Sequence, residues 1–297
     1  MKTEWIAVDW GTSHLRAWAM QGETVLDHVQ SECGMARVEK GRFEAALLSI
    51  TDSWLGSTPT DVVACGMVGA RQGWVEAPYS AVPSAPIPNM PIRVPDTDPR
   101  VRAFVVPGLK QNSPPDVMRG EETQIAGFLG KHPNWDGVVC LPGTHTKWAQ
   151  VSAGEVISFR TFMTGEIFDL LCSQSVLKHS TSDGWDDPAF SDAVEDGLSK
   201  PEQLAARLFS LRAADLLHGQ DTGTARARLS GQLIGAELAA TRPYWLGQQL
   251  AIIGSDALID IYAKALQQQG ASVETANATM VTLAGLSLAR NLTRQTV

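Results

Sequence analysis

The chain has 297 residues, 44% of them hydrophobic and 19% charged, a composition typical of a globular protein with one large or two medium domains. Its formal net charge of −8 argues against nucleic acid or an anionic membrane as a partner, although acidic proteins can still bind ATP locally. The four cysteines form no C-x-x-C pair, so we expect buried thiols in a reducing compartment. No charged leader with an apolar core opens the chain, and no apolar run approaches the ~20 residues that span a bilayer, so a cytoplasmic protein is expected.

The first notable stretch, residues 5–18, reads as strand, tight turn and strand, because apolar residues alternate on either side of Gly11. Asp9 lies where the first strand ends, and Thr12 and Ser13 follow in the turn. A carboxylate in this place can hold Mg²⁺ through water, while the N–H and hydroxyl groups of the turn can bind phosphate oxygens. The alternative is an ordinary surface hairpin with an Asp-x-Gly turn.

Strands and helices then alternate through the first half of the chain, as the change between helical and strand periods indicates. We expect a helix over residues 43–55, a strand over 61–65 and a glycine-rich loop over 66–74. A proline-rich excursion over 78–99, a strand over 102–106 and a connection between lobes over 110–115 should follow.

A helix is expected from about Arg119 to Gly130, and it begins with Glu121 and Glu122. Acidic residues at a helix N-terminus are favourable with the helix dipole by ~0.3–1 kcal/mol, which is a sufficient structural reason for them. Their place after a glycine and between two candidate phosphate turns favours a further role.

The second turn lies in the stretch 138–151, where an apolar strand meets Gly143 and Thr144 and returns as a strand. Two such turns can bind one polyphosphate from opposite sides. His145 lies in this turn, where it can donate to a phosphoryl oxygen or simply orient the loop.

The remaining chain is mostly helical. A strand over 156–159, a helix over 164–177 capped by Thr164, and an acidic surface loop with a short helix over 180–200 are expected. The buried strand 249–254 ends at Gly254 and Ser255, where a helix begins and offers free N–H groups to a base or ribose. The other expected elements are helices over 203–217, 224–240 and 256–268, a strand over 272–275, and a closing helix in which Ala284-Gly285-Leu286 permits close packing between lobes.

Several other chemistries have no sequence signal. The chain holds no G-x-x-x-x-G-K-[ST] string, no G-x-G-x-x-G after a strand and no G-x-S-x-G elbow. Its six histidines include no H-x-x-x-H pair, so a zinc site has little support.

The order of these segments resembles the phosphate-1, phosphate-2 and adenosine segments of the actin, hexokinase and heat-shock-70 ATPase superfamily. Within it, five local strings resemble the 2-dehydro-3-deoxygalactonokinase family, and the match runs essentially from end to end. The strings are Asp9-Trp10-Gly11-Thr12, Gly66-Met67-Val68-Gly69 with Arg71-Gln72-Gly73-Trp74, Arg119-Gly120-Glu121-Glu122-Thr123-Gln124, Leu141 to Trp148, and Thr164-Gly165-Glu166.

The resemblance implies an α/β, two-lobed actin-like ATPase fold, a duplicated ribonuclease H-like architecture with ATP in the interlobe cleft. An N-terminal lobe over 1–117 would carry the phosphate-1 hairpin and the sugar-acid loops. A C-terminal lobe over 118–297 would carry the phosphate-2 hairpin and the adenosine segment, with the last helix packing back toward the first lobe.

The resemblance also implies the roles of the site residues. Asp9 would hold Mg²⁺, and Glu121, with Glu122 as second candidate, would be the catalytic base, although the hexokinases carry aspartate there. ATP would be bound by Gly11, Thr12, Ser13, Arg16, Gly143, Thr144, His145, Thr146, Lys147, Gly254 and Ser255. A salt bridge within the strand is the alternative role of Arg16.

The substrate implied is 2-dehydro-3-deoxy-D-galactonate, phosphorylated on its 6-hydroxyl in galactonate breakdown. A carboxylate favours a bidentate arginine, and the candidates for the sugar-acid pocket are Arg71, Trp74, Glu76, Tyr79 and Glu166. An ATP-driven switch that binds a protein partner and a kinase for a different sugar acid are the alternatives. The sequence leaves the oligomeric state open, a homo-oligomer included.

Overall fold

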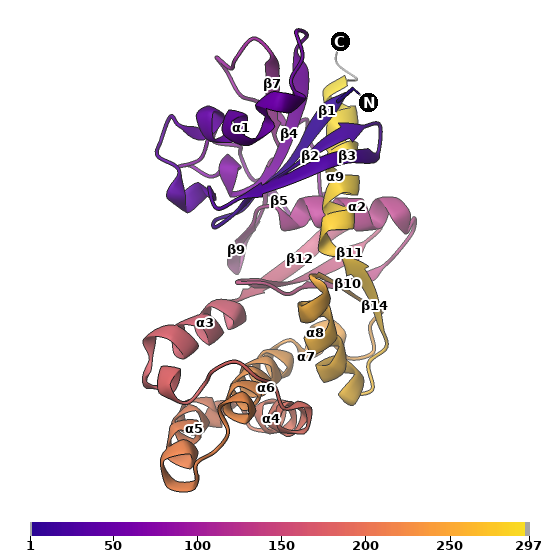
Figure 1. Ribbon diagram of the computed structural model, residues 1–297. Coiled ribbons are helices and arrows are strands. Elements are labelled where there is room, and N and C mark those ends of the chain that lie inside the picture. Colours follow the sequence, from indigo (N-terminus) through magenta and orange to yellow (C-terminus); the bar gives the residue numbers. More distant parts are fainter. Residues whose placement is uncertain (1, 295–297) are drawn as a thin grey trace. The chain divides into compact units, whose positions relative to one another are not determined.

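The computed structural model describes residues 2–294 and falls into two compact units (Figure 1). The first comprises the chain up to Asp136, the segment Val151–Phe159 and the chain from Asn277. The second comprises Gly137–Gln150 and Arg160–Ala276.

The first unit is built on a six-stranded sheet with the order β3-β2-β1-β4-β7-β6. β1 pairs antiparallel with β2 and parallel with β4, and β4 pairs parallel with β7. The first two strands therefore form the predicted hairpin, and β1 and β4 end at the same edge of the sheet. The strands are β1 (Trp5–Trp10), β2 (Leu15–Gln21), β3 (Thr24–Ser31), β4 (Thr60–Gly66), β6 (Ile92–Arg93) and β7 (Val101–Val105).

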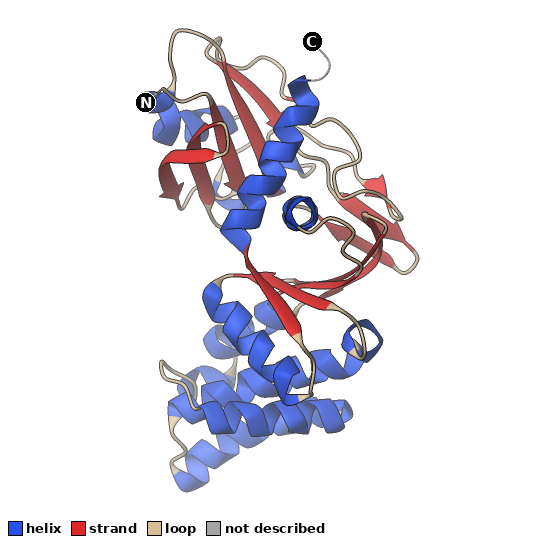
Figure 2. Ribbon diagram, turned by 90° about the vertical axis from the view of Figure 1, so that its right-hand side faces the viewer, coloured by secondary structure: helices blue, strands red, loops and turns tan. Residues whose placement is uncertain are grey.

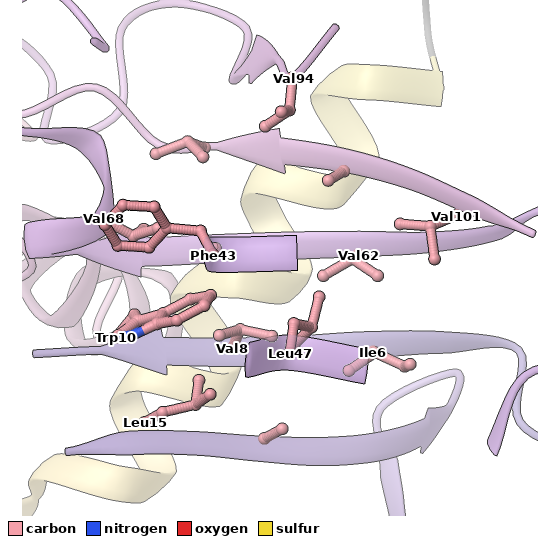
Figure 3. Close-up of a cluster of buried hydrophobic side chains, with 14 of the residues drawn as sticks. Ile6, Val8, Trp10, Leu15, Phe43, Leu47, Val62, Val68, Val94 and Val101 are labelled. Atoms are coloured by element: carbon pink, nitrogen blue, oxygen red, sulfur yellow. The ribbon is translucent and has the colours of Figure 1, made fainter. Parts of the chain in front are cut away.

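Every residue of β1 is buried, because the sheet is covered on both faces. Ile6 and Val8 pack with Phe43 of α1 (Phe43–Thr51) on one face, as Figure 3 shows. Trp5 and Ala7, which alternate with them, pack on the other face with apolar residues of the closing helix α9 (Ala278–Arg294). Figure 2 shows this long helix lying along the strands of the sheet.

Helix α9 also crosses α2 (Glu121–Lys131) at very short distance. A Cβ atom at Gly285 would lie 1.9 Å from the carbonyl oxygen of Thr123, and one at Gly127 would lie 1.9 Å from that of Val281. Glycine is therefore required on both helices. The close packing expected at Ala284-Gly285-Leu286 exists, but it joins two helices of the first unit, and α2, placed by sequence beyond the boundary at 117, belongs to that unit.

The expected connection over 110–115 is instead part of a small three-stranded sheet, with the order β5-β8-β9. β8 (Leu109–Asn112) and β9 (Pro115–Met118) form an antiparallel hairpin, and β5 (Ser80–Ala81) lies parallel to β8. Lys, Gln and Asn with two prolines give no strand signal, so the prediction here was wrong. The hydrogen bonds that pair β8 with β9 join backbone atoms, so the side chains of this segment gave no sign of them.

The second unit contains most of a five-stranded sheet with the order β12-β11-β10-β13-β14. Counted along the chain, the strands of this sheet have the same spatial order as β3-β2-β1-β4-β7 of the first unit. The duplicated architecture is thus present in the topology without a repeat in the sequence. The strands are β10 (Gly137–Leu141), β11 (Thr146–Ser152), β12 (Glu155–Phe162), β13 (Leu250–Gly254) and β14 (Val273–Asn277).

Helices make up the rest of the second unit. The segment 180–200, expected as a surface loop with a short helix, contains the 13-residue α4, whose Phe190 and Val194 are buried. Glycines bring the two helices into backbone contact. A Cβ atom added at Gly197 of α4, or at Gly231 or Gly235 of α6, would lie 2.3–2.5 Å from a carbonyl oxygen of the opposite helix. The segment was misjudged because close glycine contacts, which carry no hydrophobic signal, hold this pair together. The helices are α3 (Thr164–Gln174), α4 (Asp187–Ser199), α5 (Leu204–His218), α6 (Thr222–Ala240), α7 (Arg242–Trp245) and α8 (Asp256–Gln268).

Candidate active site

Asp9 forms an ion pair at the end of β1. Its side chain is buried, and its Oδ2 lies 2.5 Å from Nη2 of Arg16, the residue directly opposite on β2. Burial raises the pKa of Asp9, and the Arg16 guanidinium opposes that rise. Arg16 therefore forms a salt bridge with Asp9, which is the alternative role that the sequence analysis gave for it.

The turn after Asp9 is oriented by the segment that follows β3. The carbonyl groups of Gly11, Thr12 and Ser13 accept backbone hydrogen bonds from residues 35, 36 and 34, at 2.9, 3.0 and 3.3 Å. Because a trans peptide points its N–H opposite to the preceding carbonyl, the following N–H groups face away from that segment. Thr12 and Ser13 are exposed. This turn therefore presents amides and hydroxyls outward, as an anion site needs.

The start of α2 lies beside Asp9 within the first unit, with Gly66 between them. A Cβ at Gly66 would lie 3.5 Å from Asp9 Oδ1, and one at Gly120 would lie 3.4 Å from the Cα of Gly66. Both glycines have positive φ, +92° and +108°. This close approach brings the first residues of α2, Glu121 and Glu122, to the edge of the sheet where β1 ends.

The two glutamates have different environments. Glu121 is half-buried and accepts the N–H of Arg119 at 3.0 Å. Glu122 is fully buried and accepts the N–H of Gly120 at 2.7 Å and the hydroxyl of Thr123 at 2.9 Å. Burial, together with the neighbouring Glu121 charge, raises the pKa of Glu122 to about 8. At neutral pH Glu122 is mainly protonated, so of the two glutamates Glu121 has the better environment for a base.

The loop after β4 carries the predicted sugar-acid residues. Arg71 and Glu76 are exposed, whereas Trp74 is half-buried against Trp10, with ring centroids 6.2 Å apart. Tyr79 lies under the guanidinium of Arg119, whose Cζ is 4.3 Å from the ring centroid.

Arg119 was not singled out from the sequence. It is 8% exposed, and its Nη2 donates to the carbonyl of Ala77 at 2.8 Å. Its Nε and Nη1 are buried and lack an acceptor among residues 2–294. Arg119, two residues before Glu121, therefore joins the loop that carries Arg71 to the segment that begins α2.

In the second unit, the turn between β10 and β11 is held by the first residues of α3. The carbonyl of Thr144 accepts the N–H of Glu166 at 3.0 Å, and a Cβ at Gly165 would lie 2.2 Å from the carbonyl oxygen of Gly143. By the same peptide geometry, the N–H groups of Thr144 and His145 face away from α3. His145 Nε2 lies 2.6 Å from Glu166 Oε2, so this pair also joins the turn to the start of α3.

Thr146 and Lys147, the next residues, point to opposite faces of β11. The Thr146 hydroxyl is fully buried and lies 3.0 Å from that of Tyr262. Lys147 is 5% exposed, and its Nζ donates to Thr161 of β12 at 2.8 Å. Lys147 is thus held on the sheet.

The segment around Gly254 and Ser255, predicted to bind adenosine, lies beside this turn. A Cβ at Gly254 would lie 3.3 Å from Cγ of Pro142, the residue before Gly143. Ser255 is the exposed N-cap of α8, and its side chain makes no capping hydrogen bond within the described part of the chain. The start of α8 therefore presents backbone N–H groups next to the second turn.

Thr164 does not cap α3 as expected. The N-cap is Met163, and the Thr164 hydroxyl donates instead to Oε2 of Glu237, a buried residue of α6. The sequence analysis missed Glu237. The available signal was an acid within the otherwise small and apolar run from Leu233 to Ala240.

A Mg²⁺ site on this chain would have few protein ligands. Over residues 2–294, no group of three or more His, Cys, Asp or Glu side chains converges as a metal cage. A single carboxylate such as Asp9 fits Mg²⁺, which keeps several waters and binds substrate phosphates. The donor set therefore fits the ion.

Of the described helices, none has the length and apolarity to cross a bilayer.

A cavity of about 530 Å³ lies elsewhere in the first unit and is lined by residues such as Lys2, Glu4 and Trp54. Glu4 precedes β1 and Asp9 lies near its other end, so this cavity is separate from the groups described above.

Together, the duplicated sheet order, the two outward-facing turns and the carboxylates beside the first of them define an α/β ATPase of the actin and hexokinase fold. The comparisons with known proteins give the family. The family model for 2-keto-3-deoxy-galactonokinase matches residues 9–289, and the chain belongs to this family.

Curated relatives and a solved structure agree with this assignment. A Rhizobium meliloti protein named "Probable 2-dehydro-3-deoxygalactonokinase" is 39% identical, with 95% of each chain covered. The Escherichia coli 2-dehydro-3-deoxygalactonokinase is 35% identical over 92% of each chain. A crystal structure from Sinorhizobium meliloti, provisionally named a 2-dehydro-3-deoxygalactonokinase, has a TM-score of 0.90 at 37% identity and covers 98% of this chain and 99% of its own.

Proposed function

We propose that this chain transfers the γ-phosphate of ATP to the 6-hydroxyl of 2-dehydro-3-deoxy-D-galactonate in the cytoplasm. Membership of a sugar-acid kinase family supports the reaction class. The observation that carries the assignment of roles is the approach of the α2 N-terminus to Asp9 across Gly66, which brings a candidate base and a candidate metal ligand together.

The nucleotide would be bound by backbone groups more than by charge. In the first unit, the amides of Thr12 and Ser13 and their hydroxyls would meet phosphate oxygens. In the second unit, the amides of Thr144 and His145 and the start of α8 would do so. Mg²⁺, when bound, would neutralise phosphate charge.

Asp9 would hold the ion, and Arg16 would favour the charged form of the buried carboxylate through their 2.5 Å contact.

Glu121 would take the proton of the acceptor hydroxyl. General base catalysis by a side chain typically contributes ~10²–10⁴-fold. The base must be ionised before transfer, which favours Glu121 over Glu122, whose pKa lies at about 8. Glu122 would instead position Glu121, because its carboxyl group accepts the N–H of Gly120 at 2.7 Å and so fixes the backbone before Glu121.

The sugar acid would be recognised by the loop after β4. Arg71 is exposed there and can offer a bidentate fork to the substrate carboxylate. Trp74, Glu76 and Tyr79 of the same loop would line that site. Glu166, which pairs with His145, is a further candidate that rests on the family resemblance.

Coupled ADP release with MgATP tests this proposal on three acids: 2-dehydro-3-deoxy-D-galactonate, 2-dehydro-3-deoxy-D-gluconate and D-galactonate. Turnover is expected with the first acid and to be weak or absent with the others. Turnover with the second acid alone would reassign the substrate, and ATP hydrolysis indifferent to all three would refute the kinase assignment.

Glu121→Gln and Glu122→Gln form a matched pair for the base, because they are neighbours with the same change. We expect kcat to fall by ~10²–10⁴-fold in Glu121→Gln and by less than about tenfold in Glu122→Gln. ADP binding should persist in both variants. The reverse order of the two kcat values would make Glu122 the base.

A further inference from the structure

The buried carboxylate of Glu237 accepts hydrogen bonds from three different elements of the second unit. Trp148 Nε1 of β11 donates to Oε1 at 2.8 Å, and the Tyr262 hydroxyl of α8 donates to Oε2 at 3.1 Å. The Thr164 hydroxyl, at the start of α3, donates to Oε2 as well. Glu237 is 3% exposed, so it cannot meet a substrate.

Burying an acid at this place costs free energy of folding unless its hydrogen bonds offset that cost. Burial raises the pKa of Glu237 to about 7, despite three donors that act in the opposite direction. Replacing a buried hydrogen-bonded group together with its partners by apolar residues of the same shape can be nearly neutral, so overall stability is a weak reason for the whole set of polar groups. What distinguishes Glu237 is the set of elements that it joins.

Two of its three bonds lead to the turn between β10 and β11. Thr164 begins α3, and two residues later the N–H of Glu166 donates to the carbonyl of Thr144 at 3.0 Å. Tyr262 leads to the other side of the turn, because its hydroxyl lies 3.0 Å from that of Thr146.

The contact between α3 and the turn leaves no room for an added side-chain atom. A Cβ at Gly165 would lie 2.2 Å from the carbonyl oxygen of Gly143, so the helix start and the turn are in direct backbone contact. A displacement of the first turn of α3 would therefore displace the carbonyl groups of the turn and turn its N–H groups away from their present direction.

We propose that Glu237 is a positioning residue for nucleotide binding: by holding Thr164 and Tyr262, it fixes the direction in which the turn at Gly143–His145 presents its N–H groups. The inference rests on the proposed function in one respect only, namely that these N–H groups bind the phosphates of ATP. Glu237 acts through α3 and α8 and touches neither substrate.

Thr164→Val tests the link to α3 without deleting the buried acid. Valine has nearly the shape of threonine but lacks the hydroxyl, so only the bond to Glu237 is lost. Thr164→Ser keeps the hydroxyl and should restore the wild-type behaviour. Thr241→Val is the matched control, because Thr241 is fully buried and its hydroxyl donates to the backbone carbonyl of Glu237 at 2.9 Å, away from the turn.

The first measurement is nucleotide affinity. We expect Thr164→Val to weaken ADP binding by isothermal titration calorimetry, and to raise the KM for ATP, by about tenfold, the effect of one lost hydrogen bond. Thr164→Ser and Thr241→Val should keep both constants within about twofold of the wild type.

The second measurement, hydrogen exchange in the nucleotide-free protein, does not depend on the reaction. Glu166 is the third residue of α3, so its N–H has no partner within the helix, and its bond to Thr144 is the source of its protection. We expect its exchange to accelerate by about tenfold or more in Thr164→Val and not in Thr241→Val.

The outcomes separate this proposal from the proposed function. If wild-type protein fails to bind nucleotide while Glu166 exchange responds as expected, the function is wrong and the positioning role of Glu237 stands. If Thr164→Val leaves Glu166 exchange and ADP affinity unchanged, the positioning role is wrong. Equal losses of affinity in Thr164→Val and Thr241→Val would likewise refute it, because general destabilisation would then explain both.

Discussion

Glu122→Gln should change how the stability of the protein depends on pH. Glu122 is fully buried, and its pKa rises from an ordinary 4.5 to about 8 in the folded protein. Between these values the unfolded chain releases the proton and the folded protein keeps it. The folded state then binds more protons, so its stability falls as pH rises through this window.

The magnitude follows from the two pKa values. One pKa unit corresponds to about 1.4 kcal/mol, and integration from about pH 5.5 to about pH 7.5 gives a loss of about 2.5 kcal/mol from this group. Glutamine cannot ionise and lacks this loss. Its amide oxygen can still accept from Gly120 and its amide nitrogen can donate to the Thr123 hydroxyl, so any remaining cost of the change is independent of pH.

Urea unfolding of the wild type and the variant, at about pH 5.5, 6.5 and 7.5, measures the difference. We expect the free energy of unfolding of Glu122→Gln, relative to the wild type, to increase by about 2.5 kcal/mol across this range. A difference that stays constant with pH would refute the assignment of a raised pKa to Glu122. Glu237→Gln gives a comparison with a narrower window, since the pKa of Glu237 rises only to about 7.

Two further predictions concern glycines. Gly127→Ala should lower the free energy of unfolding by about 3 kcal/mol or more, because the new methyl group would lie 1.9 Å from the Val281 carbonyl oxygen. Gly130→Ala, in the same helix, meets only the flexible end of Leu288 at 3.2 Å and should be within about 1 kcal/mol of the wild type by urea unfolding. Similar losses in both would contradict the close helix contact. Gly143→Ala has no atom within 4 Å of its new methyl group and should keep its Tm, yet raise the KM for ATP by about tenfold or more if phosphate occupies that space. An unchanged KM would remove Gly143 from the nucleotide site.

Much of the fold was predictable because it is built from strongly periodic segments. The first hairpin, the helix from Asp256 to Gln268 and the buried strand before it lie where alternation, helical period and glycine punctuation placed them. Short turns between apolar strands indicated both of the turns that we propose for phosphate binding. The two similar hairpins, together with the family resemblance, indicated a duplicated fold, and the two sheets have the same strand order.

What was missed depends on backbone contacts that side-chain patterns do not encode. Between Leu109 and Met118, the β8 and β9 hairpin is mostly polar residues and prolines, which show no strand periodicity, and its strands are joined by backbone hydrogen bonds. The α4 and α6 helices pack through glycines such as Gly231, whose contribution is the absence of a side chain.

The site was predictable in part. Its exposed members, such as Thr12 and Thr144, follow strand ends and are visible as motifs. Arg119 and Glu237 act from the interior, and their partners are distant in sequence: Ala77 for Arg119, and Thr164 and Tyr262 for Glu237. Spacing along the chain gives no information about such partners. For Glu237 the only sign was a single charged residue within an apolar run, and Arg119, which has Asp116 and Glu121 nearby, had no such sign.

The placement of α9 has a consequence for the order in which the protein can fold during synthesis. The core around Trp5 and Ala7 is completed by Leu283, Leu286 and Ala289, residues that the ribosome adds after nearly all of the chain has emerged. Until then, one face of the first sheet and the glycine face of α2 have no covering helix. Strand β1 can therefore complete its packing only after α9 has been made, and in the meantime the nascent chain exposes apolar surface, which favours aggregation.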